Sequence, residues 1–170
     1  MFVLAISVAS GAFAQHSVMP AGMTHEQHMA QMKKEAELRA HGNVAMGFDQ
    51  DKTTHHFTMS ADGGAIEVSA NDAADTVSIQ QVRSHLQEIA AAFAQGDFGK
   101  PLATHSELPP GVPAMQRLKA AISFRYADMP RGGTVRIATT NAEALAAVHE
   151  FLTYQVTEHQ TGDPVDARRR

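Results

Sequence analysis

Histidine and methionine are the residues of this chain whose chemistry stands out. The 170 residues include ten His and nine Met but no Cys. Without cysteine there are no disulfides, thiolate nucleophiles or iron–sulfur clusters, and a metal ion has to be held by His, Met, Asp, Glu or backbone oxygen. Imidazole and thioether are the ligands that copper favours, and imidazole also suits zinc.

Three histidines are expected to meet between a sheet and its helices. Strand alternation points His55 inward with Phe57 and Met59, and points His56 outward. His85 and His149 lie at the edges of apolar helix faces. Three converging imidazoles would make a zinc or copper site, or a cluster for proton transfer. The plainer interpretation makes each of them a core-edge residue with its own hydrogen-bond partner.

Two further segments bring histidine to the same region. His105 precedes a proline-rich stretch, and stiff prolines can hold a side chain at the mouth of a pocket. The alternative is a rigid connector with an exposed histidine. Residues 41–50 supply His, Met and Asp just before the first strand, either as a lid over a site or as an ordered loop.

A separate Met/His tract lies nearer the N-terminus. Residues 24–40 are expected to form a helix, because Thr24 and Gln27 match a capping box. Helical spacing would put His25, His28, Met29 and Met32 on one face, with Met23 just before it. Thioether together with imidazole suits Cu(I), so the tract supplies auxiliary copper ligands in one interpretation. A solvated low-complexity linker is the other.

The remaining pattern predicts an α+β domain built from two β-β-α units. Alternating strands flank Gly63-Gly64 and again Gly132-Gly133, which mark two hairpin turns. A helix starting at Asp75 or Thr76 follows the first hairpin, and a helix capped by Asn141 follows the second. Between them we expect a proline-rich loop and a short helix over residues 113–120. The units together predict a four-stranded antiparallel sheet with helices packed on one face, although any two hairpin–helix units look alike.

The first residues indicate export. Residues 1–14 are uncharged and apolar and end in Ala12-Phe13-Ala14, which fits a signal peptide cut after Ala14 and a periplasmic or secreted protein. We then expect a flexible segment over residues 15–42, the domain over 43–164 and a basic tail over 165–170. The net charge of −4 argues against nucleic acid as a partner, and no integral membrane span is expected.

Several blocks of the sequence carry a family resemblance. The run from His41 to Gln50, HGNVAMGFDQ, is followed by TTHHF over residues 53–57, and later by Gly96-Asp97-Phe98, PPGV over residues 109–112 and HQTGD over residues 159–163. Together they resemble a group of small secreted bacterial proteins of unassigned function. The resemblance implies an exported single domain, and it assigns no catalytic residue.

The sequence therefore supports three hypotheses. The first is a periplasmic protein that binds copper or zinc through His55, His56, His85, His105 and His149, aided by the Met/His tract. The second is a small exported enzyme with a histidine-based active site, with or without metal. The third is a module that binds a small molecule or a partner on the free face of the sheet. The motifs of serine hydrolases, zinc proteases and nucleotide-binding loops are absent, and a homodimer remains open.

Overall fold

The computed structural model describes residues 22–165, apart from the side chains of residue 31 and residues 34–41. The predicted signal peptide and all but the first residue of the predicted basic tail lie outside that range. The chain forms two compact units, Met1–Glu35 and Ala36–Arg170, which are treated separately below. Helix α1, His25–Met46, runs through the boundary between them.

The start of α1 follows the predicted capping box. The backbone N–H of Gln27 donates to Thr24 Oγ1, and the backbone N–H of Thr24 donates to Gln27 Oε1. The helix is longer than the expected residues 24–40: it continues to Met46 and is followed by Gly47, whose φ is +74°. Residues 41–46 are therefore helical rather than a loop. None of the helices within residues 22–165 combines the length and apolar composition that crossing a membrane requires.

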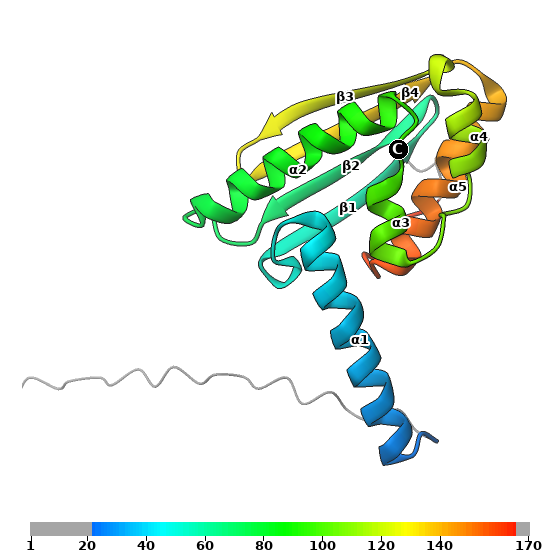
Figure 1. Cartoon of the computed structure of the whole chain (residues 1–170). Coiled ribbons are helices and arrows are strands. Elements are labelled where there is room, and N and C mark those ends of the chain that lie inside the picture. The colour runs from blue at the N-terminus through cyan, green and yellow to red at the C-terminus, as the bar shows by residue number, and fades with distance from the viewer. Residues whose placement is uncertain (1–21, 166–170) are drawn as a thin grey trace, which may run out of the picture. The chain divides into compact units, whose positions relative to one another are not determined.

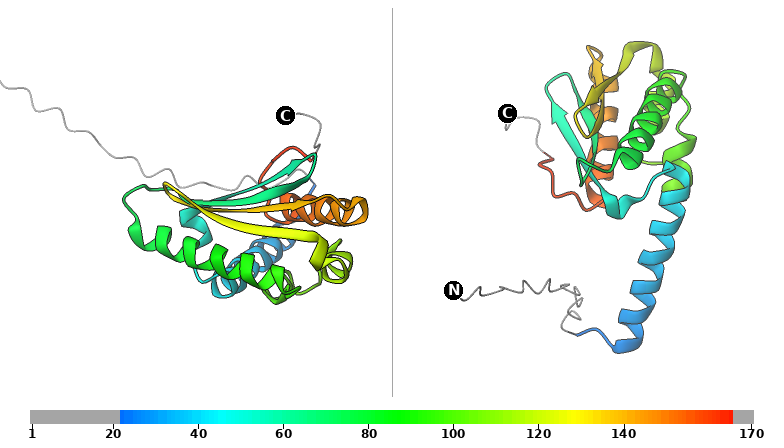
Figure 2. Two further views of the ribbon diagram at one scale, coloured as in Figure 1. Left: turned by 90° about the horizontal axis from the view of Figure 1, so that it is seen from above. Right: turned by 90° about the vertical axis from the view of Figure 1, so that its left-hand side faces the viewer.

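The second unit contains the predicted α+β arrangement (Figure 1). Strands β1 (Thr53–Ser60), β2 (Gly63–Ala70), β3 (Ile122–Met129) and β4 (Gly132–Thr139) form one antiparallel sheet in the order β1-β2-β4-β3. Helices α2 (Thr76–Ala94) and α5 (Ala142–Glu158) both lie on one face of it, as the left-hand view of Figure 2 shows. Asp75 and Asn141 cap them through side-chain oxygens that accept from Ser78 N and Ala144 N.

Short helices fill the connections. A 3-10 turn, Gln50–Lys52, precedes β1, while α3 (Gly99–His105), α4 (Val112–Arg117) and a second 3-10 turn, Lys119–Ala121, join the two halves. Helix α3 occupies what was expected to be loop. Its Pro101 lies in the first turn, where a helix does not need the backbone N–H that proline lacks. The predicted short helix is shifted slightly and begins at Val112.

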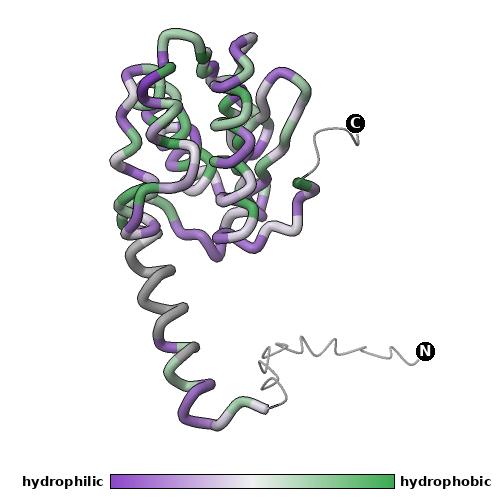
Figure 3. The backbone as a smooth tube through the Cα atoms, turned by 90° about the vertical axis from the view of Figure 1, so that its right-hand side faces the viewer, coloured by the Kyte–Doolittle hydropathy of each residue, from purple (hydrophilic) through white to green (hydrophobic). Residues whose placement is uncertain are grey.

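Alternation along the strands and helical periodicity build the core. The chain alternates between hydrophobic and hydrophilic residues along its regular elements, as Figure 3 shows by colour. Inward-facing strand residues such as Phe57, Val68 and Ile137 pack against Val82 and Leu152 of the two long helices, and all five are buried.

The two halves of the sheet are related by an approximate two-fold axis. Gly63 pairs with Ala138 in the central β2–β4 ladder, just as Gly132 pairs with Ser69. Each half's helix reaches the hairpin of the other half. Arg83 on α2 donates to the carbonyls of Met129 and Gly132, and at the equivalent place His149 on α5 lies 3.0 Å from the carbonyls of Ser60 and Gly63.

The same symmetry explains the repeated glycines. A Cβ on Gly63 would lie 2.1 Å from the Ile137 carbonyl oxygen, and one on Gly132 would lie 2.0 Å from that of Val68. Gly63 also has a φ of +147°, as expected for a turn glycine, whereas no positive φ is found at Gly132. Close approach of the two central strands therefore excludes larger residues at both positions.

Candidate functional site

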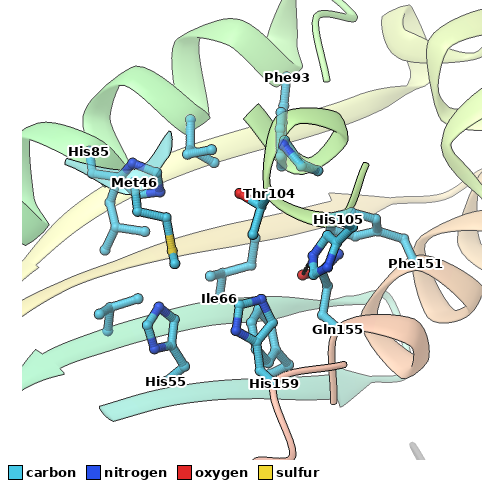
Figure 4. A pocket seen from close by; sticks show the side chains of 15 residues that line it. Met46, His55, Ile66, His85, Phe93, Thr104, His105, Phe151, Gln155 and His159 are labelled. Atoms are coloured by element: carbon cyan, nitrogen blue, oxygen red, sulfur yellow. Dashed lines mark hydrogen bonds between the residues drawn. The ribbon is translucent and has the colours of Figure 1, made fainter. Parts of the chain in front are cut away.

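A cavity of about 50 Å³ lies at one end of the second unit, between the sheet and its helices. On the same measure, about 10–15 Å³ holds one water molecule, so the cavity has room for a few waters or a small ligand. Most of its wall is apolar. Its polar and sulfur-bearing side chains, which converge in Figure 4, are Met46, His55, His85, Thr104, His105, Gln155 and His159.

Each pocket histidine comes from a different element. His55 points inward from β1, His85 comes from the middle of α2, His105 is the last residue of α3, and His159 caps the C-terminus of α5. The ring centroids of His55 and His159 are 5.2 Å apart, and those of His105 and His159 are 5.3 Å apart. Segments distant in sequence thus bring imidazoles into direct contact.

Burial keeps these histidines neutral at pH 7. It lowers the pKa of His55 to about 4, helped by the nearby His85 and His56, and it lowers the pKa of His85 to about 4. It also lowers the pKa of His159 to about 3, aided by His55 and His105, and lowers the pKa of His105 despite the Gln155 hydrogen bond. A neutral imidazole carries a nitrogen lone pair, which is the form that binds metal or accepts a hydrogen bond.

Two polar atoms of the pocket, Gln155 Nε2 and His85 Nδ1, have no hydrogen-bond partner, and a third, His105 Nδ1, keeps a lone pair. His105 Nε2 lies 3.2 Å from Gln155 Oε1, so Nε2 carries the proton and Nδ1 keeps the lone pair. The Nε2 amide group of Gln155 and the Nδ1 atom of His85 have no partner, although these side chains are only 4% and 8% exposed. Such groups cost stability when they stay unpaired, so the pocket offers them to a ligand.

The other half of the fold shows that these polar residues are not needed for packing. By strand register His55 corresponds to Phe124, and by helix caps Gln155 and His159 correspond to Ile89 and Phe93. Phe93 and Phe124 pack edge to face with their ring centroids 5.7 Å apart, and the corresponding His159 and His55 rings stack at 5.2 Å. In the other half, apolar side chains therefore fill the positions that correspond to His55, Gln155 and His159. Packing does not require polar residues there, which points to a functional reason for them.

The structure brings together only part of the predicted histidine set. His55, His85 and His105 line the pocket, but His149 and His56 do not. The expectation that His149 converges with His55 and His85 is wrong, because its Nε2 instead faces the carbonyls of the β1–β2 turn. His56 faces outward, with its side chain 51% exposed and 3.0 Å from Asp163.

The predicted ligand set did not include His159, Gln155, Met46 or Thr104, although residues 41–50, which contain Met46, were considered as a lid over a site. A signal was present for the first two, because they continue the face of α5 that carries Leu152 at helical spacing. Polar residues on an otherwise buried stripe indicate a polar site. Met46 lines the pocket because α1 extends beyond its expected end. Thr104 lines it because residues 99–105 form helix α3, where a loop was expected.

The segment after α5 is fastened to the edge strand β1. The carboxylate of Asp163 accepts the backbone N–H of Phe57 at 2.9 Å and lies 3.0 Å from His56 Nδ1. Burial raises the pKa of Asp163, but hydrogen bonds from Thr161, Phe57 and His56 outweigh it and lower the pKa overall. Asp163 lies four residues beyond His159, so its hydrogen bonds to β1 hold the chain in place just after it leaves the pocket.

The Met/His tract belongs to the first unit. Helix α1 begins at His25, so His25, His28, Met29 and Met32 are helical, whereas Met23 precedes the helix and its cap. Within residues 22–165, no three His, Asp or Glu side chains already surround a point where a metal ion could sit. No protein family model, curated protein or solved structure matches the chain. The function of the pocket has to be argued from its chemistry.

Proposed function

We propose that this chain is a metal-binding protein that takes one Cu(I) ion in the histidine pocket. The observation that carries the proposal is the gathering of four neutral imidazoles and one thioether around a cavity whose wall is mostly apolar. These are the soft and borderline ligands that Cu(I) prefers. The proposal keeps the periplasmic or secreted location that the sequence predicts, and it replaces His149 and His56 by His159 and Met46 as candidate ligands.

The charge of the pocket favours a monovalent ion. Among the described residues no Asp or Glu lines the cavity, and the lowered pKa values keep its histidines uncharged. An ion bound there keeps its full charge in surroundings of low polarity. The solvation cost of burying an ion rises with the square of its charge, so a divalent ion pays about four times the cost of Cu(I). Zinc is therefore the weaker candidate.

Ring spacing supports metal binding after a small rearrangement. Two imidazoles on one metal ion, each with a metal–nitrogen distance of about 2.0–2.1 Å, have ring centres about 5 Å apart. The His55–His159 and His105–His159 pairs are at 5.2 and 5.3 Å. These spacings are compatible with two imidazoles on one ion once their rings have rotated, since the His55 and His159 rings are stacked at 20° to each other. The Gln155 oxygen beside His105 Nε2 already orients that ring, as partners of metal-bound histidines do.

The test is an anaerobic titration of the full chain with Cu(I) in competition with a chromophoric chelator. We expect tight binding of one ion to depend on the pocket and to weaken by about tenfold or more in a His55→Phe, His159→Phe variant. The matched control is His56→Ala, which removes the neighbouring but outward-facing imidazole. Equal affinity in the pocket variant and the parent would overturn the proposal.

A small uncharged organic ligand is the second candidate, favoured by the unpaired amide of Gln155. That group donates hydrogen bonds and does not bind metal ions, so it suits a ligand with an acceptor oxygen. The cavity of about 50 Å³ limits such a ligand to a few non-hydrogen atoms. Thermal stabilisation of the protein by small amides or alcohols, with no response to Cu(I), would favour this candidate.

A further inference from the structure

One face of the first turns of α1 presents four soft donor side chains. The capping box starts the helix at His25, and this fixes the helical phase of the residues that follow. His25, His28, Met29 and Met32 are three or four residues apart, so they are neighbours on the helix surface. Their imidazole and thioether groups lie on one side of two successive turns.

Three of these side chains are exposed to solvent and the fourth, His28, is half-buried. Met29 is 55% exposed and Met32 is 37% exposed, and His25 is exposed as well. Methionine is a residue that proteins usually bury, yet here two methionines are exposed on one side of a helix, next to two histidines. Thioether sulfur is a poor hydrogen-bond acceptor but a good ligand for soft metal ions.

We infer that this face of α1 is a second Cu(I) site, formed by two imidazole nitrogens and two thioether sulfurs. The i,i+4 pairs His25–Met29 and His28–Met32 each place one nitrogen and one sulfur on adjacent turns. The site is built by a single helix and therefore does not depend on the histidine pocket. Because its ligands are exposed, it exchanges its ion with the solvent more readily than a buried site does.

The experiment uses the full chain with methyl-labelled methionine and Cu(I) added without oxygen. We expect the methyl signals of Met29 and Met32 to shift together on titration. A Met29→Leu, Met32→Leu variant should lose this site and bind about one equivalent less, since leucine keeps the helix propensity of methionine while removing sulfur. Circular dichroism checks that the helix content is unchanged.

Met23→Leu is the matched control, because it removes the same kind of sulfur at a residue that precedes the helix and its cap. It should leave the titration unchanged. The inference is overturned if the signals of Met29 and Met32 do not respond, or if Met23→Leu has the same effect as the double variant. Repeating the titration in the His55→Phe, His159→Phe background separates the two sites: the α1 signals should still shift whether or not the pocket binds copper.

Discussion

The approximate symmetry of the domain defines a substitution that separates function from folding. Replacing His55 and His159 with phenylalanine installs the pair that Phe124 and Phe93 form in the other half. We expect this variant to be at least as stable as the parent at pH 7, because two aromatic rings are packed at the equivalent place and the neighbouring cavity leaves room for them. It should also lose the pocket's ligand.

The same variant should resist acid better than the parent. The pKa of His55 falls from 6.5 to about 4 and that of His159 to about 3, so the unfolded chain binds more protons over this range. The contribution of each neutral histidine to the free energy of unfolding is therefore fully present above pH 6.5 and is lost as the pH falls. The loss levels off near the pKa of that histidine in the folded state. At pH 5 each histidine lowers the free energy of unfolding by about 2 kcal/mol, or about 4 kcal/mol for the pair.

The assay is urea unfolding followed by circular dichroism at pH 7 and pH 5. The difference in unfolding free energy between the two pH values should be about 4 kcal/mol smaller in the variant than in the parent. Replacement of the exposed His25 by alanine serves as the control and should leave the difference unchanged. If the variant loses as much stability as the parent on acidification, or is already several kcal/mol less stable at pH 7, burial of the two histidines is not what makes the parent sensitive to acid.

Three further predictions concern the surroundings of the pocket. Gln155→Ile copies Ile89 of the other half; it should weaken Cu(I) binding about tenfold by freeing the His105 ring, while urea unfolding shows unchanged or higher stability because a buried unpaired amide is removed. Asp163→Asn weakens the fastening on β1 and should lower the unfolding free energy by about 1 kcal/mol, with faster exchange of the Phe57 amide proton. Arg83→Ala should cost about 1.5–3 kcal/mol in the same urea assay by releasing two turn carbonyls, yet leave Cu(I) affinity unchanged. A change in Cu(I) affinity in Arg83→Ala would contradict the view that the hydrogen bonds from Arg83 to the β3–β4 turn are independent of the pocket.

Local patterns were sufficient to predict most of the fold. Two hairpins with glycine turns, two capped helices and their apolar faces led to the four-stranded sheet with helices on one face, and the structure confirms it. Alternation along β1 correctly placed His55 inside and His56 outside. These features depend on residues close in sequence, where helix and strand periodicity are informative.

The composition of the site depended on contacts that local patterns do not specify. His149 lies on the second helix between apolar residues, much as His85 lies on the first, yet it faces a turn of the opposite hairpin because each helix crosses to the other half. Its structural counterpart is Arg83 rather than His85, which follows only from the registers and caps of the folded chain. His159 reaches the pocket because the chain is fastened beyond it by Asp163, a contact between residues 106 positions apart.

Copper binding in the histidine pocket is tested most directly by identifying the atoms that ligate the ion. X-ray absorption at the copper edge would be measured on the Met29→Leu, Met32→Leu protein loaded with one equivalent of Cu(I), so that the α1 face cannot contribute its sulfurs. We expect the spectrum to show imidazole nitrogens with one thioether sulfur around the metal, and to be lost when His55→Phe and His159→Phe are added. An unchanged spectrum after these two substitutions, or copper that does not stay bound to the parent, would contradict copper binding in the pocket.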